Sequence, residues 1–228
     1  MITGDIILSF FKYTMLNQFL QRIQNKKLAL NSTALIQATT SSFIWLYGSS
    51  TQLRINTSGY FLFDLLYLLT QREKNFLHST YYYHHLVSIY YMSLDPINFN
   101  WFNVIGVGEV SNIPSYIVYY YLKTKPVTRQ GVLTESEIAV EKLEKQRHNN
   151  KLQFWKTVQK FWFSGIRVIV ATYLTYNELI KPNHIKPLLP VIPLYFLGIV
   201  WSLNMHKNQY YITEYIIYII YIIYIWII

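Results

Sequence analysis

Two adjacent histidines, His84 and His85, and a lone carboxylate, Glu109, are the residues whose types and spacing could do chemistry. The histidines lie in a tyrosine-rich apolar run at 77–94, and Glu109 lies in the next apolar run, at 101–122. A carboxylate that orients an imidazole fixes its tautomer and stabilises its charged form, so the pair can transfer protons. An imidazole can also accept an acyl group as a nucleophile. The alternative is a His–Glu hydrogen bond between helices that only stabilises the fold.

Further polar residues accompany these groups at helical spacing. Glu109, Asn112 and Tyr116 follow one another at i, i+3 and i+7, which places them on one face of a helix. Pro114 lies in the same run and should free a backbone carbonyl near that face, because proline has no N–H to donate. Ser88 lies three residues after His85 and shares a helix face with it. The candidate lipid- or substrate-binding residues are Asp64, Ser88, Ser111, Asn112 and Tyr116.

The apolar residues of the chain cluster into runs of the length that membrane helices need. The chain has 228 residues, of which 52% are hydrophobic, and a span needs about 20 mostly apolar residues in a row. We predict an all-α fold, a polytopic transmembrane bundle whose six spans are 29–48, 57–71, 78–95, 100–122, 157–177 and 187–205. The first span is rich in hydroxyl and amide side chains, which require partners on neighbouring helices. Residues 6–20 form either an interfacial helix or a span, and residues 209–228 form either a further span or a loosely packed tail, so seven or eight spans are alternatives.

The basic residues predict the orientation of this bundle. Fourteen lysines and arginines border one side of the predicted spans and three border the other, so the first side is expected to be cytosolic. That side carries the loop at 123–156, in which 134–148 should be a helix because Thr134 and Glu137 can form a capping box. The loop is either a solvated connector or a surface for acidic lipid head groups. The predicted parts are an N-terminal interfacial or membrane helix at 1–21, a transmembrane domain at 22–207 and an isoleucine- and tyrosine-rich tail at 208–228.

Composition excludes several classes of function. The chain has no cysteine, which excludes disulfides, thiolate catalysis and cysteine-ligated zinc. It has six histidines but no HExxH or HxxxH pair, so we expect no metal site and no bound cofactor. The formal net charge of +9 comes from basic residues that lie between apolar runs rather than on one continuous face. We therefore expect membrane lipids, and not nucleic acid, as partners.

Three blocks of residues resemble one known family when taken in order. They are Gly59-Tyr60-Phe61 with Asp64, then His84-His85, then the segment from Gly106 to Asn112 with Pro114. Their order and spacing are similar to those of the TLC family (TRAM–LAG1–CLN8), multi-pass proteins of the endoplasmic reticulum, and most of all to its small members of the transmembrane protein 56 type. Trp201 and Asn204 are a weaker match to the last helix of the family, and the resemblance covers about residues 22–207.

The resemblance implies lipid handling, lipid sensing or control of membrane lipid composition. The family includes ceramide synthases, whose motif is a histidine pair followed by two aspartates three residues apart. Carried over, the pair falls on His84 and His85, the first aspartate on Glu109 and the second on Asn112. The alternative is therefore an N-acyltransferase with acyl-CoA as co-substrate, in which the histidines act as base or acyl acceptor and Glu109 orients one of them. A second alternative is an escort or interaction module for other membrane proteins. The partners expected besides lipids are other membrane proteins or further copies of the chain, and the expected location is the endoplasmic reticulum or a host-derived internal membrane.

Overall fold

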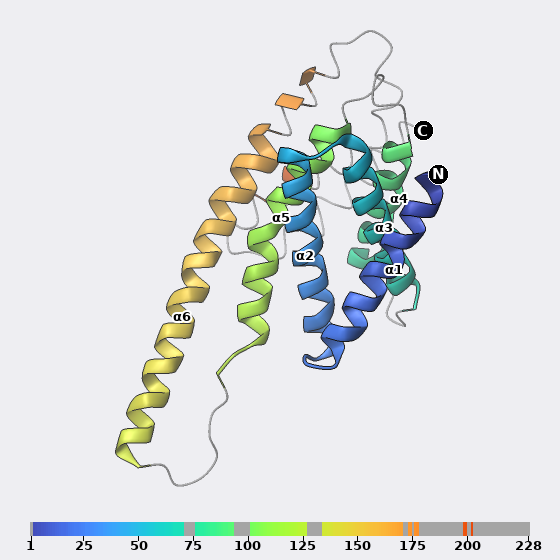
Figure 1. Ribbon diagram of the computed structural model, residues 1–228. Coiled ribbons are helices and arrows are strands. Elements are labelled where there is room, and N and C mark those ends of the chain that lie inside the picture. Colours follow the sequence, from blue (N-terminus) through green and yellow to red (C-terminus); the bar gives the residue numbers. More distant parts are fainter. Residues whose placement is uncertain are drawn as a thin grey trace.

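The described part of the protein is built from helices joined by short turns. The computed structural model describes residues 2–70, 76–93, 101–126 and 134–170, with residues 173, 174, 176, 177, 198, 199 and 202. Six α-helices and a π-helical segment account for most of these residues, which confirms the all-α class. In chain order they are α1 (Ile2–Gln21), α2 (Lys26–Tyr47), α3 (Ser50–Leu69), α4 (Phe76–Ser93), α5 (Trp101–Lys123), α6 (Glu135–Phe163) and η1 (Ser164–Val170) (Figure 1). The tail at 208–228 lies outside the described residues, as do most of the predicted span at 187–205 and part of the loop at 123–156.

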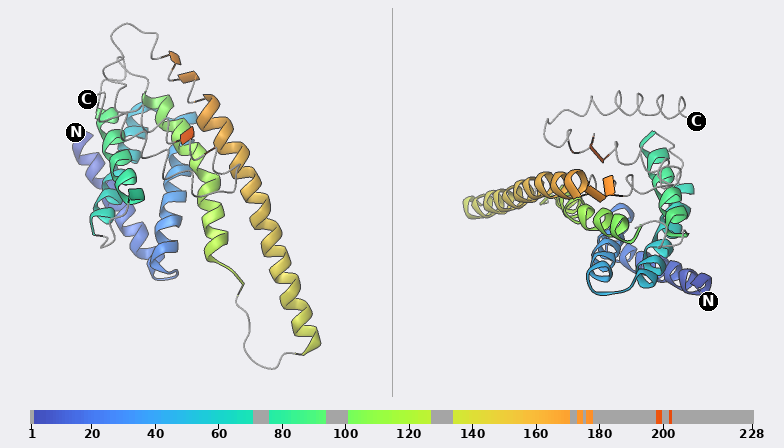
Figure 2. Two further views of the ribbon diagram at one scale, coloured as in Figure 1. Left: turned by 180° about the vertical axis from the view of Figure 1, so that it is seen from behind. Right: turned by 90° about the horizontal axis from the view of Figure 1, so that it is seen from above.

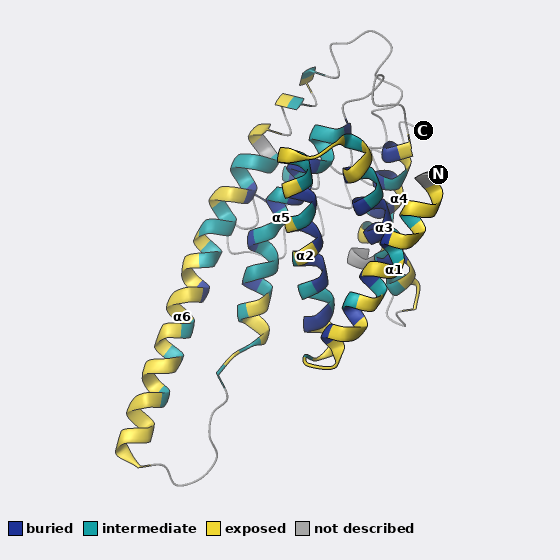
Figure 3. Cartoon of the chain, in the orientation of Figure 1, coloured by how far each residue is buried: buried dark blue, intermediate teal, exposed yellow. Residues whose placement is uncertain are grey.

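Helices α1 to α5 pack side by side into a bundle, which Figure 2 shows from behind and from above. The most extensive contacts pair α2 with α5 and α1 with α3, and α6 lies along α5. The first half of α6 extends beyond the ends of the other helices and is exposed to solvent (Figure 3). Among the described residues, no helix combines the length and the apolar character that spanning a bilayer requires.

The predicted span at 57–71, short enough to extend into its flanks, lies largely in α3, which begins seven residues earlier, at Ser50. The helix starts at a capping box, in which the Ser49 hydroxyl accepts a hydrogen bond from the Gln52 backbone N–H at 3.2 Å. The Gln52 side chain in turn accepts one from the Ser49 N–H at 2.9 Å. Such a box satisfies two backbone donors that a helix end leaves free. Polar side chains carry this signal, so a search for apolar runs does not detect it.

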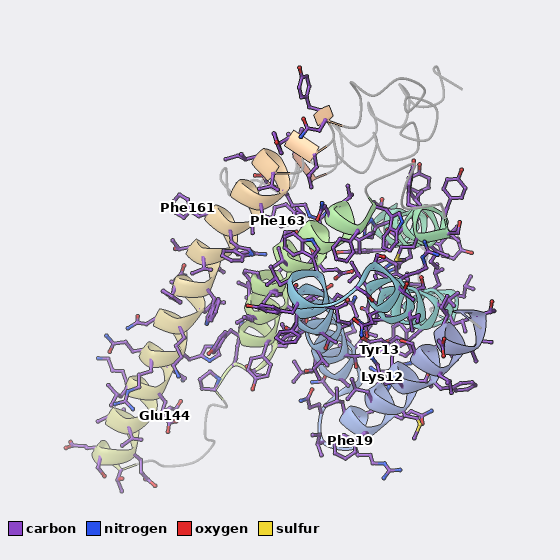
Figure 4. The ribbon with its side chains drawn as sticks, turned by 45° about the horizontal axis from the view of Figure 1, so that its top comes forward. Lys12, Tyr13, Phe19, Glu144, Phe161 and Phe163 are labelled. Atoms are coloured by element: carbon purple, nitrogen blue, oxygen red, sulfur yellow. The ribbon has the colours of Figure 1, made fainter. Side chains whose placement is uncertain are left out.

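The predicted capping box at Thr134 and Glu137 is present and starts α6. The predicted end of that helix at 148 is wrong, because α6 continues without a break to Phe163. The soluble connector and the beginning of the predicted span at 157–177 are therefore one helix. Near the end of α6, the Phe163 side chain faces the bundle and the Phe161 side chain points away from it (Figure 4).

Replacing Thr134 by alanine should loosen the first turn of α6 by about 1 kcal/mol, because it removes the N-cap acceptor. Amide hydrogen exchange should be faster at Glu137 and Ile138, while the turns near Phe163 keep their protection. Ser136→Ala is the matched control, since among the described residues the Ser136 hydroxyl bonds to the Thr134 hydroxyl, at 3.1 Å, and to no backbone N–H. Equal exchange rates in the two variants would contradict a capping role for Thr134.

The interior of the bundle contains many polar side chains. On α2, Thr33, Gln37 and Ser41 are fully buried. The Asn17 amide of α1 donates to the Thr33 hydroxyl at 3.1 Å, and the Asn31 amide of α2 donates to a backbone carbonyl of α5 at 3.0 Å. The prediction that the polar residues of this helix need partners on neighbouring helices is thus confirmed.

Helix α1 contributes to the core and does not lie apart from it. Tyr13 and Asn17 are 1% and 3% exposed. Its backbone approaches α3 closely at Gly59, where an added Cβ would lie 2.5 Å from Ser9 Cβ and 2.8 Å from the Phe10 backbone nitrogen. Only glycine allows this approach, which is typical of tightly packed helix pairs.

Candidate functional site

The centre of the candidate site is a hydrogen-bonded acid–imidazole pair between α3 and α4. His85 Nε2 lies 2.6 Å from Asp64 Oδ2, and the side chains are 7% and 14% exposed. A carboxylate can only accept, so Nε2 carries the proton and the lone pair of the neutral ring is on Nδ1. The Nδ1 atom is buried and has no hydrogen-bond partner among the described residues. Asp64 thus holds the ring in the tautomer whose second nitrogen is free to take a proton.

The partner of His85 corrects the prediction made from the sequence, which paired a histidine with Glu109. Within the described residues no hydrogen bond or ion pair joins either histidine to Glu109. Glu109 is 4% exposed and bonds to the Gln37 side chain of α2 instead. It still lies close enough to interact electrostatically with His85 and with Arg167.

Aromatic rings surround the two histidines. The centroid of the His85 ring lies 4.7 Å from that of the Phe61 ring and 6.5 Å from that of the Tyr60 ring. The His84 ring lies 6.0 Å from Phe61 and 5.5 Å from His85. His84 therefore packs beside the pair, as expected for a neighbour rotated by about 100° on the same helix. Of the two, only His85 forms a hydrogen bond with a carboxylate among the described residues.

Arg167 belongs to the site and was missed by the sequence analysis. Its Nε donates to the Ser111 hydroxyl at 2.8 Å, and its Nη2 donates to the Asn112 amide oxygen at 2.8 Å and to the Gly108 carbonyl at 3.3 Å. Its guanidinium carbon is 5.2 Å from the centre of the Phe163 ring. An arginine inside the predicted span at 157–177 was the available signal, because a charge at that depth is costly unless it has a role.

The other predicted site residues have separate places. Ser111 and Asn112 are the partners of Arg167. Ser88 is buried on α4, 4% exposed, and Tyr116 packs against the hydrophobic core of the bundle. The described residues include no cluster of three metal-ligating side chains.

Pro114 frees a backbone carbonyl, as predicted. The carbonyl of Val110, four residues earlier, is the one that loses its helical donor to the proline. The indole N–H of Trp162 donates to it at 2.9 Å. A side chain of α6 thus satisfies the carbonyl that the proline leaves free on α5.

A network of polar side chains runs from the outer side of α1 to Glu109. The Asn56 amide oxygen accepts from Lys12 Nζ and from the Tyr13 hydroxyl, both at 2.7 Å. The Asn56 amide group donates to Ser41 Oγ at 2.9 Å, and Ser41 Oγ also accepts from Gln37 at 2.9 Å. Gln37 then bonds to the carboxylate of α5. These contacts join four helices, although Gln37 Oε1 has no hydrogen-bond partner among the described residues.

Comparison with profiles of known protein families, with curated proteins and with solved structures gives no match. The chemistry of the site therefore follows from its geometry alone. The described helices bring together one acid–imidazole pair, one further carboxylate and one guanidinium. This set can accept a proton at His85 and bind groups of either charge.

Proposed function

We propose that this chain is a multi-pass membrane protein of TLC type that binds lipids at the polar interior around Asp64 and His85. The observation that carries the proposal is the distribution of side chains: many polar side chains are buried beside the hydrophobic core, and many large apolar side chains lie on the exterior. Buried polar residues include Thr33, Gln37 and Glu109. In water the opposite arrangement is the stable one, because burial of apolar surface drives folding.

The outer face of α1 illustrates the apolar exterior. Large apolar residues recur there at a spacing of four, which forms one continuous stripe along the helix. Between 49% and 69% of each of these side chains is exposed: Ile7, Leu8, Phe11, Met15 and Phe19. A patch of this kind needs either lipid or a protein partner to cover it.

The helix lengths fit a bilayer. Helices α1 to α5 have 18 to 23 residues, which is about 27–35 Å at 1.5 Å per residue. A hydrocarbon core is about 30 Å thick. A helix whose polar side chains face other helices contacts lipid only with its outer side, so a bundle can be lipid-facing although its helices are polar inside.

The interior supports a head-group site. Asp64 with His85, Glu109 and Arg167 place ionisable groups of both signs inside the bundle. Such residues at membrane depth usually mark a substrate path or binding site. They also include the residues that resemble the TLC motifs, which favours the same class, with the endoplasmic reticulum or another internal membrane as its location.

A second candidate, N-acyl transfer, is favoured by one observation, the free Nδ1 of His85. In this reaction Nδ1 of His85 would take a proton from the amine of a sphingoid base while the amine nitrogen attacks the thioester carbonyl of an acyl-CoA. The new C–N bond forms, the C–S bond breaks, and the thiolate of coenzyme A leaves with the proton from His85. Asp64 would stabilise the transient imidazolium.

We expect His85→Leu and Asp64→Leu to retain about ten- to hundredfold less bound lipid than the wild type, since a hydrogen bond to a charged group contributes about 1.5–3 kcal/mol. The full chain is purified in mild detergent, and its bound lipids are extracted and measured by mass spectrometry. The same preparations are incubated with labelled acyl-CoA and sphingoid bases to detect amide products.

His148→Ala is the matched control, because that histidine lies on α6 and bonds to the Tyr121 carbonyl at 2.9 Å. Lipid retention with no amide product supports binding alone, and product that disappears in both leucine variants supports acyl transfer. A wild-type chain that retains no lipid and remains soluble without detergent would overturn the proposal. Specific retention of another membrane protein in its place would support the escort alternative.

A further inference from the structure

A groove of about 680 Å³ opens between α1, the end of α2 and the start of α3. This volume falls within the range of about 300–1,000 Å³ that is typical of ligand sites. None of the residues of the Asp64–His85 site lines it. Its lining includes Leu8, Phe43, Tyr47, Lys12, Asp5 and Asn56.

Lys12 is the positive charge of this groove. It is the only basic residue of α1, and its ammonium group donates to the Asn56 amide oxygen at 2.7 Å. It also lies 4.3 Å from the centre of the Tyr13 ring, and the two side chains stand next to each other where α1 meets the bundle (Figure 4). An ammonium has three donors, and both of these partners are neutral. Among the described residues no carboxylate forms an ion pair with Lys12, so its charge is held in place but not neutralised.

The apolar surroundings make this charge costly. Leu8 is 69% exposed and Phe11 is 53% exposed, and both lie within one turn of Lys12 on α1. Phe43 and Tyr47, on the opposite wall, are 64% and 76% exposed. A cation on a lipid-facing surface is unfavourable unless an anion accompanies it. Asp5 lines the same groove two helical turns earlier, at its other end.

We propose that this groove binds a long-chain fatty acid, with its carboxylate on Lys12 Nζ and its acyl chain along Leu8, Phe43 and Tyr47. The inference rests on the lipid-facing position of α1 in the proposed function. Lys12 lies near the middle of α1, about 15 Å from either end at 1.5 Å per residue. Phospholipid phosphates stay at head-group level, whereas a single-chain acid can reach this depth in its uncharged, protonated form and ionise beside Lys12. Its carboxylate then supplies the ion-pair partner that Lys12 lacks among the described residues, and the apolar walls bury the chain.

The test uses the full chain in phosphatidylcholine nanodiscs and a photoactivatable fatty acid with a diazirine in its chain. Cross-linked peptides are mapped by mass spectrometry, and unlabelled palmitate or methyl palmitate competes with the probe. We expect saturable cross-links to the segments around Leu8, Phe43 and Tyr47, and competition by the acid but not by its ester. Lys12→Gln should lower apparent affinity about tenfold or more, because it removes the charge and keeps a donor for Asn56.

Lys26→Gln is the matched control, since Lys26 also lies over a tyrosine ring, at 5.3 Å from Tyr67, but does not line the groove. Lys26→Gln and Asp5→Asn should leave binding intact, and Leu8→Trp should reduce it by filling the groove. Equal loss in the Lys12 and Lys26 variants, or equal competition by acid and ester, would overturn the proposal. Three further outcomes would also contradict the proposal. Competition by phosphatidylglycerol alone would indicate a phospholipid site, and weaker binding in Asp5→Asn would indicate a zwitterionic ligand. Cross-links between two chains would indicate a dimer contact. His85→Leu keeps the groove, so its binding separates failure here from failure of the interior site.

Discussion

Replacing Asp64 by leucine is expected to destabilise the protein by about 1–3 kcal/mol, because the buried Nε2–H of His85 then loses its acceptor. His85→Leu should cost a similar amount, since it leaves the Asp64 carboxylate unpaired. The variant with both leucines should be more stable than the sum of the single effects predicts, because neither polar group remains. We expect a coupling free energy of about 1–3 kcal/mol from this double-mutant cycle.

The measurement is equilibrium unfolding of the full chain in detergent micelles, followed by circular dichroism. A second cycle between Glu109 and His85 serves as the comparison, because Glu109 bonds to Gln37 rather than to the imidazole. Its coupling free energy should be clearly smaller. If the Glu109 cycle gave the larger coupling, the pairing seen in the structure would be refuted and the pairing expected from the sequence would stand.

Gly59→Ala is expected to destabilise the protein by about 1–3 kcal/mol or more, the usual effect of overpacking. The added methyl carbon would lie 2.5 Å from Ser9 Cβ and 2.8 Å from the Phe10 backbone nitrogen. Since a backbone atom is among these neighbours, a side-chain rotation cannot relieve the clash, and α1 must move away from α3. The displacement should also disturb the nearby hydrogen bonds from Lys12 and Tyr13 to Asn56.

Gly108→Ala is the matched control, because among the described residues an added Cβ at Gly108 meets nothing within 4 Å. Both glycines lie inside helices, α3 and α5. Alanine should therefore stabilise the chain at position 108 by about 0.5–1 kcal/mol, the difference in helix propensity. Unfolding in detergent measures the two effects side by side. Destabilisation of equal size at both positions would show that loss of glycine itself, and not close packing of α1 on α3, is responsible.

The two sites differ in what they need from the fold. The Asp64–His85 pair depends on the contact of α3 with α4, whereas the Lys12 groove depends on α1, α2 and α3. The polar network through Asn56, Ser41 and Gln37 joins the second region to Glu109. A ligand that draws Lys12 away from Asn56 would therefore alter this network at its Lys12 end. The Glu109 end of the same network lies near the Asp64–His85 pair.

The sequence by itself determined the all-α fold class and much of the local structure. Apolar runs predicted α2, α4 and α5 within a few residues, because a helix is specified by neighbours three and four positions apart. The Thr134–Glu137 box was predictable for the same reason, since both partners lie within one turn. Residue types alone also selected Asp64, His85 and Glu109 as ionisable groups in apolar runs.

Only the tertiary structure decided which of these groups meet. Asp64 and His85 are 21 residues apart, and Arg167 and Asn112 are 55 apart. Spacing within one helix says which residues share a face, but the partner of that face depends on helix order and rotation. Two acids, Asp64 and Glu109, were available to one imidazole, and packing of α3 against α4 placed Asp64 on Nε2. The same packing left Nδ1 without a partner, which is the feature that makes His85 a candidate for chemistry.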